Sequence, residues 1–329
     1  VARETNTPVV ARGSGTGLSG GATPNADGIL LSLGKFNRIL SINPLARRAI
    51  VQPGVRNAAI SEAAVSHGLY YAPDPSSQIA CSIGGNVAEN AGGMHCLKYG
   101  LTVHNVLKLR AWTIEGELLE IGSDGLDAAG YDLLALLTGS EGLLGVVTEV
   151  TVRILKKPET ARAVLVGFPS SEDAGECVSR IIGAGIIPGG MEMMDKPAIH
   201  ATEEFVHAGY PLDVEALLIV ELDGPQAEVD HLEREAEALA VGNAGDVAEL
   251  HQRVEHAECR AGVDAGGAGD FGERHLRLLG GERLEHAQPL GERIDEIAAV
   301  VRRGRLALAR CCCRAGLRAR TRPPPRTRR

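Results

Sequence analysis

The sequence predicts an α+β protein with two unlike domains and an atypical end. Up to residue 156, short β-rich runs alternate with tight turns that contain glycine or proline. After residue 157, strands and amphipathic helices follow one another, an order that favours a mainly antiparallel sheet with helices on one side. A chain of 329 residues is long enough for two such domains. We therefore expect a first domain at 1–156, a partial second domain at 157–242 and a tail at 243–329.

The first domain is expected to consist mostly of short strands. Four runs with high β propensity predict strands, at 7–11, 29–33, 49–52 and 147–155. A helix is expected to run from Asn57, as its N-cap, to His67, and Gly68 ends it. The Glu115-Gly116 turn predicts a hairpin, and Asp132–Leu137 predicts a short helix.

The second domain begins after a change of composition at Lys156-Lys157-Pro158. Three further runs predict strands, at 163–168, 191–194 and 216–222. Between and after them lie three predicted helices. One is capped by Ser170, one spans Pro197–Val206, and one starts at Pro225, which suits a first helical turn.

The stretch from Pro73 to Gly93, PDPSSQIACSIGGNVAENAGG, has the composition of a ligand-binding segment. It holds two glycine pairs, Gly84-Gly85 and Gly92-Gly93, with asparagines between them and no cationic side chain. Glycine lets a ligand lie against the bare backbone, and serine and asparagine form hydrogen bonds without a net charge. The stretch predicts a cradle for a large ligand with phosphate, sugar and heterocycle.

A second glycine-rich stretch, RGSGTGLSGG, runs from Arg12 to Gly21. Its glycines fit the G-x-G-x-x-G pattern of dinucleotide-binding folds, but a strand follows it where such folds have a helix. It also lacks the Lys-Ser/Thr pair of a P-loop. The remaining interpretation is a turn whose N–H groups bind a pyrophosphate. Arg12 either adds positive charge there or is a solvated strand end.

These two stretches, together with GSEGLLGVVT at 139–148, resemble the FAD-linked oxidases of the vanillyl-alcohol oxidase, or PCMH-type, family. The similarity is greatest to the branch of glycolate oxidase FAD-binding large subunits and D-lactate dehydrogenases, and it covers residues 1 to 242. The resemblance implies a PCMH-type FAD-binding domain of two subdomains, followed by an α+β cap domain. It also implies that 139–145 closes over the flavin and adenine side.

The resemblance further implies which residues bind FAD. The expected cofactor-binding residues are Arg12, Gly13, Ser14, Gly15, Thr16, Gly17, Pro73, Asp74, Ser76, Ser77, Ser82, Ile83, Gly84, Gly85, Asn86, Asn90, Gly92, Gly93, Tyr99, Gly100, Glu141, Gly142, Gly145 and Val146. FAD is expected to be noncovalent, because RGSGTG has no His or Cys where attached relatives carry one. No metal is expected. No catalytic base is assigned, and His95 is read as a surface histidine.

The function that the resemblance implies is oxidation of a small 2-hydroxy acid, glycolate or D-lactate, to the 2-oxo acid. The hydride goes to flavin N5, and electrons pass to a partner or a quinone. The alternative is an FAD-binding protein that lacks the C-terminal half of its active site. Expected partners are an iron–sulfur electron-transfer subunit and a second FAD-type subunit. The expected location is the cytoplasm, with attachment to the inner membrane through partners.

The composition argues against three other classes of protein: nucleic-acid binders, membrane-spanning proteins and disulfide-rich proteins. The net charge is −8, and since residues 302–329 hold 11 Arg and no acid, the rest of the chain carries −19, unlike a nucleic-acid binder. No apolar run reaches 18 residues and no signal peptide follows Val1. Seven scattered cysteines indicate reduced thiols. Because the chain starts without Met, we expect that part of the first domain precedes it.

The tail is unlike the rest of the chain. No Lys follows Lys196, and Phe271 is the only Phe, Tyr or Trp after Tyr210. The family's His-Ala-Gly-Asp-Gly-Asn segment has only a loose counterpart near Gly269–Gly272. Two interpretations stay open: a frameshifted end, or a divergent and partly disordered tail. Either predicts that residues beyond about Asn243 do not complete the second domain.

Overall fold

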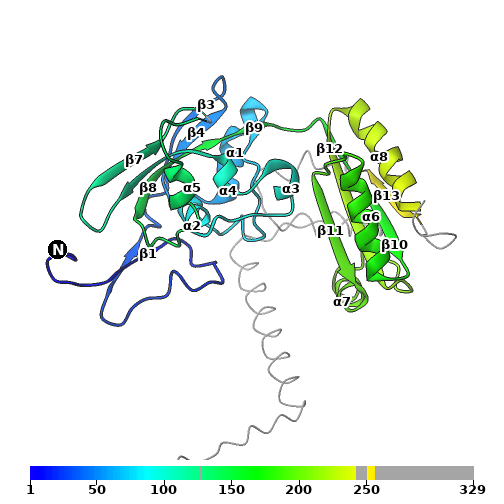
Figure 1. The fold of residues 1–329 in the computed structure, drawn as a ribbon, viewed down its shortest axis with the longest axis horizontal. Coiled ribbons are helices and arrows are strands. Elements are labelled where there is room, and N and C mark those ends of the chain that lie inside the picture. Colours follow the sequence, from blue (N-terminus) through cyan, green and yellow to red (C-terminus); the bar gives the residue numbers. More distant parts are fainter. Residues whose placement is uncertain (126, 242–249, 256–329) are drawn as a thin grey trace, which may run out of the picture. The chain divides into compact units, whose positions relative to one another are not determined.

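The computed structural model describes residues 1–125, 127–241 and 250–255, and the predictions for the tail at 243–249 and 256–329 lie outside them. The fold is α+β, as expected, and its larger sheet lies in the first domain (Figure 1). This sheet has the order β3-β4-β8-β6-β7 and is antiparallel throughout. Its strands are β3 (Ile39–Asn43), β4 (Arg48–Val51), β6 (Val106–Trp112), β7 (Leu118–Gly122) and β8 (Val146–Arg153).

The core of the first domain lies on one face of this sheet. Alternate residues of the strands point inward, for example Ala49 and Val51 of β4 and Leu109 of β6, all fully buried. Helices α1 (Asn57–Ala64) and α2 (Ile83–Glu89) contribute Ile60 and Val87 to the same core. Burial of these apolar side chains therefore fixes α2, and the loops at its two ends, against the sheet.

Two smaller strand pairs complete the first domain. Strand β1 (Val9–Arg12) pairs in parallel with β2 (Ile29–Ser32), so the loop that leaves the end of β1 must cross back to the opposite end of the pair, where β2 begins. Strand β5 (Leu69–Tyr70) pairs with β9 (Leu155–Lys156). The hairpin predicted around Glu115-Gly116 is confirmed as β6 and β7.

The short helices of the first domain differ from the expectation at two places. The first helix begins at Asn57 but Asn57 does not cap it, because its side chain bonds to Pro73 and Asn86 instead. The helix continues as a 3₁₀ turn η1 (Val65–His67), and Gly68 ends it in a left-handed conformation, as predicted. The stretch 73–93 holds a helix, α2, that the sequence did not predict. Three more short helices follow: α3 (Cys96–Tyr99), α4 (Thr102–Asn105) and α5 (Leu133–Leu137).

The second domain is a sheet of order β11-β12-β10-β13 with antiparallel neighbours, as predicted. Its strands are β10 (Thr160–Phe168), β11 (Gly190–Asp195), β12 (Ala216–Gly224) and β13 (Leu250–Glu255). Its helices are α6 (Ser171–Gly183), α7 (Lys196–Val206) and α8 (Gln226–Val241). Ser170 caps α6 through a hydrogen bond from the Asp173 N–H, as expected.

Helices α6 and α8 pack on the sheet around Phe168, Ile181 and Val229, which are almost fully buried. Strand β13 lies beyond Asn243 and pairs with β10. The sheet therefore takes a strand from a stretch that was not expected to contribute to this domain. In the described part of the chain, no helix is long and apolar enough to cross a membrane.

Candidate functional site

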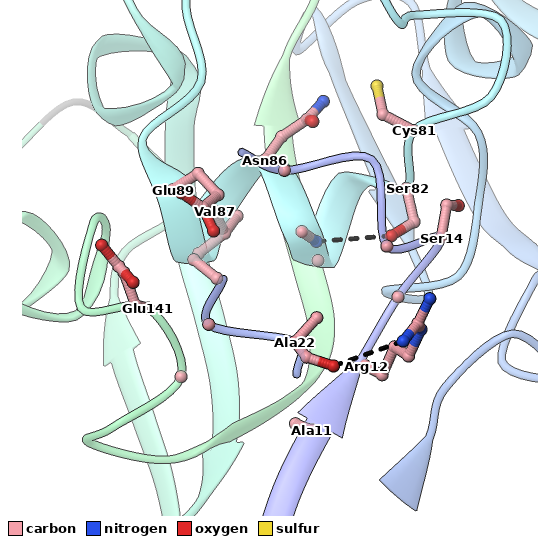
Figure 2. A pocket seen from close by; sticks show the side chains of 18 of the residues that line it. Ala11, Arg12, Ser14, Ala22, Cys81, Ser82, Asn86, Val87, Glu89 and Glu141 are labelled. Atoms are coloured by element: carbon pink, nitrogen blue, oxygen red, sulfur yellow. Dashed lines mark hydrogen bonds between the residues drawn. The ribbon is translucent and has the colours of Figure 1, made fainter. Parts of the chain in front are cut away.

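A cavity of about 700 Å³ lies in the first domain, where three segments of the chain meet. They are the loop after β1, the segment from Pro75 through α2, and the loop before β8 (Figure 2). The volume falls in the range of roughly 300–1,000 Å³ that is typical of small-molecule and cofactor sites. Two of the three segments are the glycine-rich stretches that the sequence singled out, and the third is 139–148.

The loop after β1 offers a row of main-chain donors to this cavity. Among the described residues, no hydrogen bond uses the N–H groups from Gly13 to Leu18. Gly15 has a φ of +69°, and a Cβ there would lie 2.4 Å from Nη2 of Arg12, so the glycine leaves room for the guanidinium. Arg12 also donates to the carbonyl oxygen of Ala22 at 3.4 Å, which holds it beside the loop. Free N–H groups beside a cation form an anion-binding site.

The N-terminus of α2 has a different character, because its first N–H groups are already bound. Ile83 donates to Val55 and Gly84 to Pro53, each at 2.8 Å. Gly85 donates to the Ser82 hydroxyl, the helix cap, and Asn86 to the Ser82 carbonyl oxygen. This helix therefore shapes the wall of the cavity, while the loop at 13–18 supplies the free donors.

The third segment is attached to the far end of α2. The Gly139 N–H donates to the carbonyl oxygen of Val87 at 2.7 Å, and the Glu141 N–H to that of Ala88 at 2.8 Å. Glu141 has a φ of +52°, so the chain turns sharply there and brings its side chain to the cavity wall. The two hydrogen bonds fix the position of this loop relative to the helix.

The structure brings many of the predicted cofactor-binding residues together. Those that line the cavity are Arg12, Gly13, Ser14, Gly15, Thr16, Gly17, Ser77, Ser82, Gly84, Gly85, Asn86, Glu141, Gly142 and Gly145. The others lie outside its lining: Pro73, Asp74, Ser76, Ile83, Asn90, Gly92, Gly93, Tyr99, Gly100 and Val146. Loop 13–17 and the start of α2 thus lie where they were expected.

Several residues outside the lining have clear structural roles. Asn90 ends α2 in a left-handed conformation and accepts a hydrogen bond from the Val103 N–H at 3.0 Å. A Cβ on Gly93 would lie 2.2 Å from a carboxylate oxygen of Asp74, so this glycine is needed for packing. Tyr99 donates to the carboxylate of Asp223 in the second domain.

Sequence reasoning missed other lining residues. These are Ala11, Leu18, Gly20, Gly21, Ala22, Thr23, Pro24, Leu33, Pro53, Pro75, Cys81, Val87, Ala88, Glu89, Ala91, Leu137, Ser140 and Val147. Glu89 is the acid among them, and it accepts a hydrogen bond from the Ser19 hydroxyl at 3.0 Å. Glu89 lies one helical turn after Asn86, on the same face of α2. A prediction of this helix would therefore have placed Glu89 beside the cavity.

The cavity and its donors fit a dinucleotide cofactor. The free N–H groups of 13–18 suit a pyrophosphate, and buried apolar groups such as Val87 and Val147 suit a planar ring system. Among the described residues, no group of His, Cys, Asp and Glu is arranged to hold a metal ion. His95, which the sequence suggested to be a surface residue, is instead partly buried between two carboxylates.

Two family models match the chain. Residues 1–122 match the "FAD binding domain" model, and residues 157–268 match the model "FAD linked oxidases, C-terminal domain". Together they cover most of both domains and include β13, which lies beyond the boundary expected at residue 242. Their order along the chain is the order that the sequence predicted.

Similar sequences and a similar solved structure point to the same family. The chain is 60% identical to glycolate oxidase subunit GlcD of Escherichia coli over 256 residues, 78% of this chain and 51% of that protein. It is 39% identical to the D-lactate dehydrogenase of Archaeoglobus fulgidus over 204 residues, 62% of this chain and 45% of that one. A solved structure of alkyldihydroxyacetonephosphate synthase matches with a TM-score of 0.67 at 20% identity, over 84% of this chain and 51% of that chain, and so supports the fold.

The chain spans about half the length of the curated relatives it matches. Within that half lie the cavity residues described above and the matches to both family models. The cavity residues, the two models and the level of identity all lead to one family and one cofactor. The chain belongs to the FAD-linked oxidases, and its cofactor is FAD.

Proposed function

We propose that the chain oxidises a small 2-hydroxy acid, of the glycolate or D-lactate type, to the corresponding 2-oxo acid. The observation that supports this best is the row of N–H groups from Gly13 to Leu18, which have no partner within the described part of the chain and lie in a cavity of cofactor size. The substrate class is supported by the similarity to glycolate oxidase subunit GlcD and to D-lactate dehydrogenase.

In this proposal the chain's own residues bind and orient FAD. The N–H groups of loop 13–18 and the guanidinium of Arg12 hold the pyrophosphate. Ser77 and Ser82 offer hydroxyl groups to polar atoms of the cofactor. The loop with Glu141 and Gly142 closes the adenine side, held in place by its two hydrogen bonds to α2. Because RGSGTG at 12–17 has no His or Cys to which a flavin could be attached, we propose that FAD is bound noncovalently.

When bound, FAD supplies the acceptor for the hydride that leaves the hydroxyl-bearing carbon of the substrate. The hydroxyl proton must pass to a base, and we leave that role unassigned. The apolar part of the cavity wall, including Leu33, Val87 and Val147, excludes water from the cofactor. The protein therefore contributes position and a low local dielectric constant.

We further propose that the electrons leave FAD for a partner, either an iron–sulfur subunit with a second FAD-type subunit or a quinone. The E. coli relative is itself described as a subunit, which supports an assembly of this kind. The proposed location is the cytoplasm, with attachment to the inner membrane through these partners.

The test starts with protein loaded with FAD and freed of unbound cofactor. Acid precipitation should release the yellow colour into the supernatant. Under anaerobic conditions, glycolate, D-lactate and D-2-hydroxyglutarate are added separately, and the loss of oxidised-flavin absorbance is followed. At least one of the first two should reduce the flavin, and the corresponding 2-oxo acid should appear in equal amount.

The controls separate binding from catalysis. Two control compounds should leave the flavin oxidised: L-lactate, which has the opposite configuration, and acetate, which has no hydroxyl group. Flavin that binds but is not reduced by any hydroxy acid would contradict the proposal and favour a catalytically incomplete FAD-binding protein. Flavin that stays with the acid pellet would show covalent attachment.

A further inference from the structure

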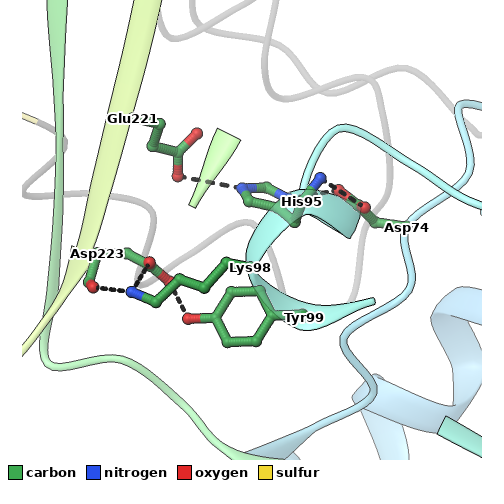
Figure 3. Close-up of polar contacts among 6 residues, drawn as sticks. All are labelled: Asp74, His95, Lys98, Tyr99, Glu221 and Asp223. Carbon is green, nitrogen blue, oxygen red and sulfur yellow. Dashed lines mark hydrogen bonds and ion pairs between the residues drawn. The ribbon is translucent and has the colours of Figure 1, made fainter. Parts of the chain in front are cut away.

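A group of charged residues lies away from the cavity, where His95 meets strand β12 (Figure 3). The Nδ1 atom of His95 lies 2.6 Å from Oδ2 of Asp74, and its Nε2 atom lies 3.2 Å from Oε1 of Glu221. The His95 main-chain N–H also donates to Asp74, at 3.3 Å. We call these three residues the Asp74–His95–Glu221 bridge. It joins a loop of the first domain to the sheet of the second.

The bridge requires a protonated imidazole. A neutral histidine has one N–H group, yet both ring nitrogens of His95 face carboxylate oxygens. Burial of the ring lowers the pKa of His95, but the hydrogen bonds to Asp74 and Glu221 and their negative charges outweigh burial and raise it to about 10. At neutral pH the bridge is therefore a cation between two anions.

Two further residues of the first domain, Lys98 and Tyr99, also bind strand β12. Lys98 donates to Oδ1 of Asp223 at 2.6 Å, and the Tyr99 hydroxyl donates to Oδ2 of the same carboxylate, which is only 5% exposed. Burial and the hydrogen bond to Asp223 raise the pKa of Tyr99, so it remains a donor. Tyr70 packs edge-on against Tyr99, and burial raises its pKa to about 12. Among the described residues, the charged groups that face the His95 ring are the carboxylates of Asp74 and Glu221.

Asp74, at the other end of the bridge, is connected to the cofactor cavity through its neighbours in the chain. Asp74 lies between Pro73 and Pro75, whose rings fix φ and stiffen the loop. Pro75 lines the cavity directly. The Pro73 carbonyl oxygen accepts a hydrogen bond from Asn57 at 2.8 Å, and Asn57 accepts one from Asn86, which also lines the cavity. A displacement of Asp74 would therefore move two parts of the cavity wall.

We propose that His95 is a positioning residue for the cofactor site, tying the loop at 73–77 to strand β12 so that FAD affinity depends on the second domain. Neither Asp74, His95 nor Glu221 lines the cavity, so their effect on FAD is carried by Pro75 and the Asn57–Asn86 pair. By linkage, bound FAD in turn stabilises the bridge. The proposal uses FAD binding alone and does not depend on which hydroxy acid is oxidised.

The test compares FAD dissociation constants, measured by quenching of flavin fluorescence, for the whole chain and its variants. Glu221→Gln removes one anion of the bridge at a distance from the cavity lining, and we expect the dissociation constant to rise at least about fivefold. His95→Gln should raise it further, because it removes the cation. Glu192→Gln makes the same chemical change on an exposed residue of the neighbouring strand β11 and should leave the constant unchanged.

Two further readouts separate positioning from a merely structural junction. For the starting protein, FAD affinity should fall as the pH rises through about 10, whereas His95→Gln should lack this step. Circular dichroism of each apo variant shows whether it is folded, and Glu221→Gln is the milder change should His95→Gln unfold the chain.

A Glu221→Gln protein that is folded but binds FAD as well as Glu192→Gln would overturn the proposal. So would the absence of FAD binding by the starting protein. Tight FAD binding without reduction by hydroxy acids would contradict the proposed reaction only, and the affinities of the variants would still decide the role of His95.

Discussion

The loop at 13–21 and the segment at 82–93 are both rich in glycine and border the same cavity, but their main-chain N–H groups differ. In the loop, the N–H groups from Gly13 to Leu18 have no partner among the described residues. In the segment, the N–H groups at the start of α2 all bind protein acceptors. The first stretch uses glycine to expose backbone to a ligand, and the second uses it to let protein segments approach closely.

The second stretch shows this closeness at three positions. A Cβ on Gly84 would lie 2.5 Å from Cβ of Pro53, and one on Gly92 would lie 2.7 Å from a methyl group of Leu101. A Cβ on Gly93 would lie 2.3 Å from the Asp74 carbonyl oxygen. By contrast, Gly85 has space on its outer side. Glycine content alone therefore does not separate ligand contact from chain packing.

The largest effect is expected from Gly84→Val, which breaks the packing of α2 on Pro53. Overpacking of this kind costs typically about 1–3 kcal/mol of the free energy of unfolding. The apo protein should melt at a lower temperature, and FAD binding should be lost as a consequence. Backbone strain does not contribute, because Gly84 is part of helix α2 and its φ is not positive.

Gly85→Val is the matched comparison on the next residue. Its Cβ would approach only the Ser82 hydroxyl, at 3.3 Å, and its side chain would occupy the cavity. FAD binding should be lost while the apo melting temperature stays close to that of the starting protein. Equal losses of stability in the two variants would show that both glycines serve packing alone.

A smaller effect is expected in the loop from Thr16→Pro, which removes one of the free N–H groups. Loss of a hydrogen bond to a charged phosphate should raise the FAD dissociation constant about tenfold. Thr16→Ala keeps the N–H group and should bind FAD almost normally. If the two variants bind equally well, the main chain at Thr16 does not contact the cofactor.

The segment at 82–93 also differs from the loop at 13–21 because an ion pair flanks it. Asp74 precedes the segment, His95 follows it, and the two side chains are paired. The pKa of His95 is raised from 6.5 to about 10, so the bridge stabilises the folded state fully below about pH 6.5 and is lost as the pH rises through about 10. The difference in apo melting temperature between the starting protein and His95→Gln should therefore shrink toward about pH 10. A difference that is independent of pH would show that the ring's size matters and its charge does not.

The smallest effect is expected from Ser77→Ala, at a cavity residue next to the segment. FAD affinity should fall by about 1 kcal/mol, the usual net worth of one hydrogen bond. Titration of the two proteins with FAD under identical conditions measures this. An unchanged affinity would mean that Ser77 lines the cavity without bonding to the cofactor.

Local sequence signals predicted much of the fold. The hairpin at Glu115-Gly116, the cap at Ser170, the short helix predicted at 132–137 and the helix end at Gly68 depend on neighbouring residues alone, and the structure has all four. Helix α2 was missed because two adjacent glycines and an asparagine have low helix propensity. Burial of Ile83 and Val87 in the core overrides that propensity.

The parts of the candidate site that lie within one short stretch of sequence could be predicted, and the contacts between distant stretches could not. Loop 13–17 could be recognised from its own composition. The roles of Asp74, Asn57 and His95 depend on partners far along the chain, such as Glu221, and no spacing in the sequence encodes these pairings.

The position of β8 has a consequence for the order in which the chain acquires function during synthesis. Strand β8 is the last of its five-stranded sheet to be made, yet it lies in the centre, paired with both β4 and β6. Before residue 153 leaves the ribosome, β3-β4 and β6-β7 are two separate hairpins, which are marginally stable alone. A nascent chain that ends before β8 therefore has both glycine-rich stretches but no cavity to hold a cofactor.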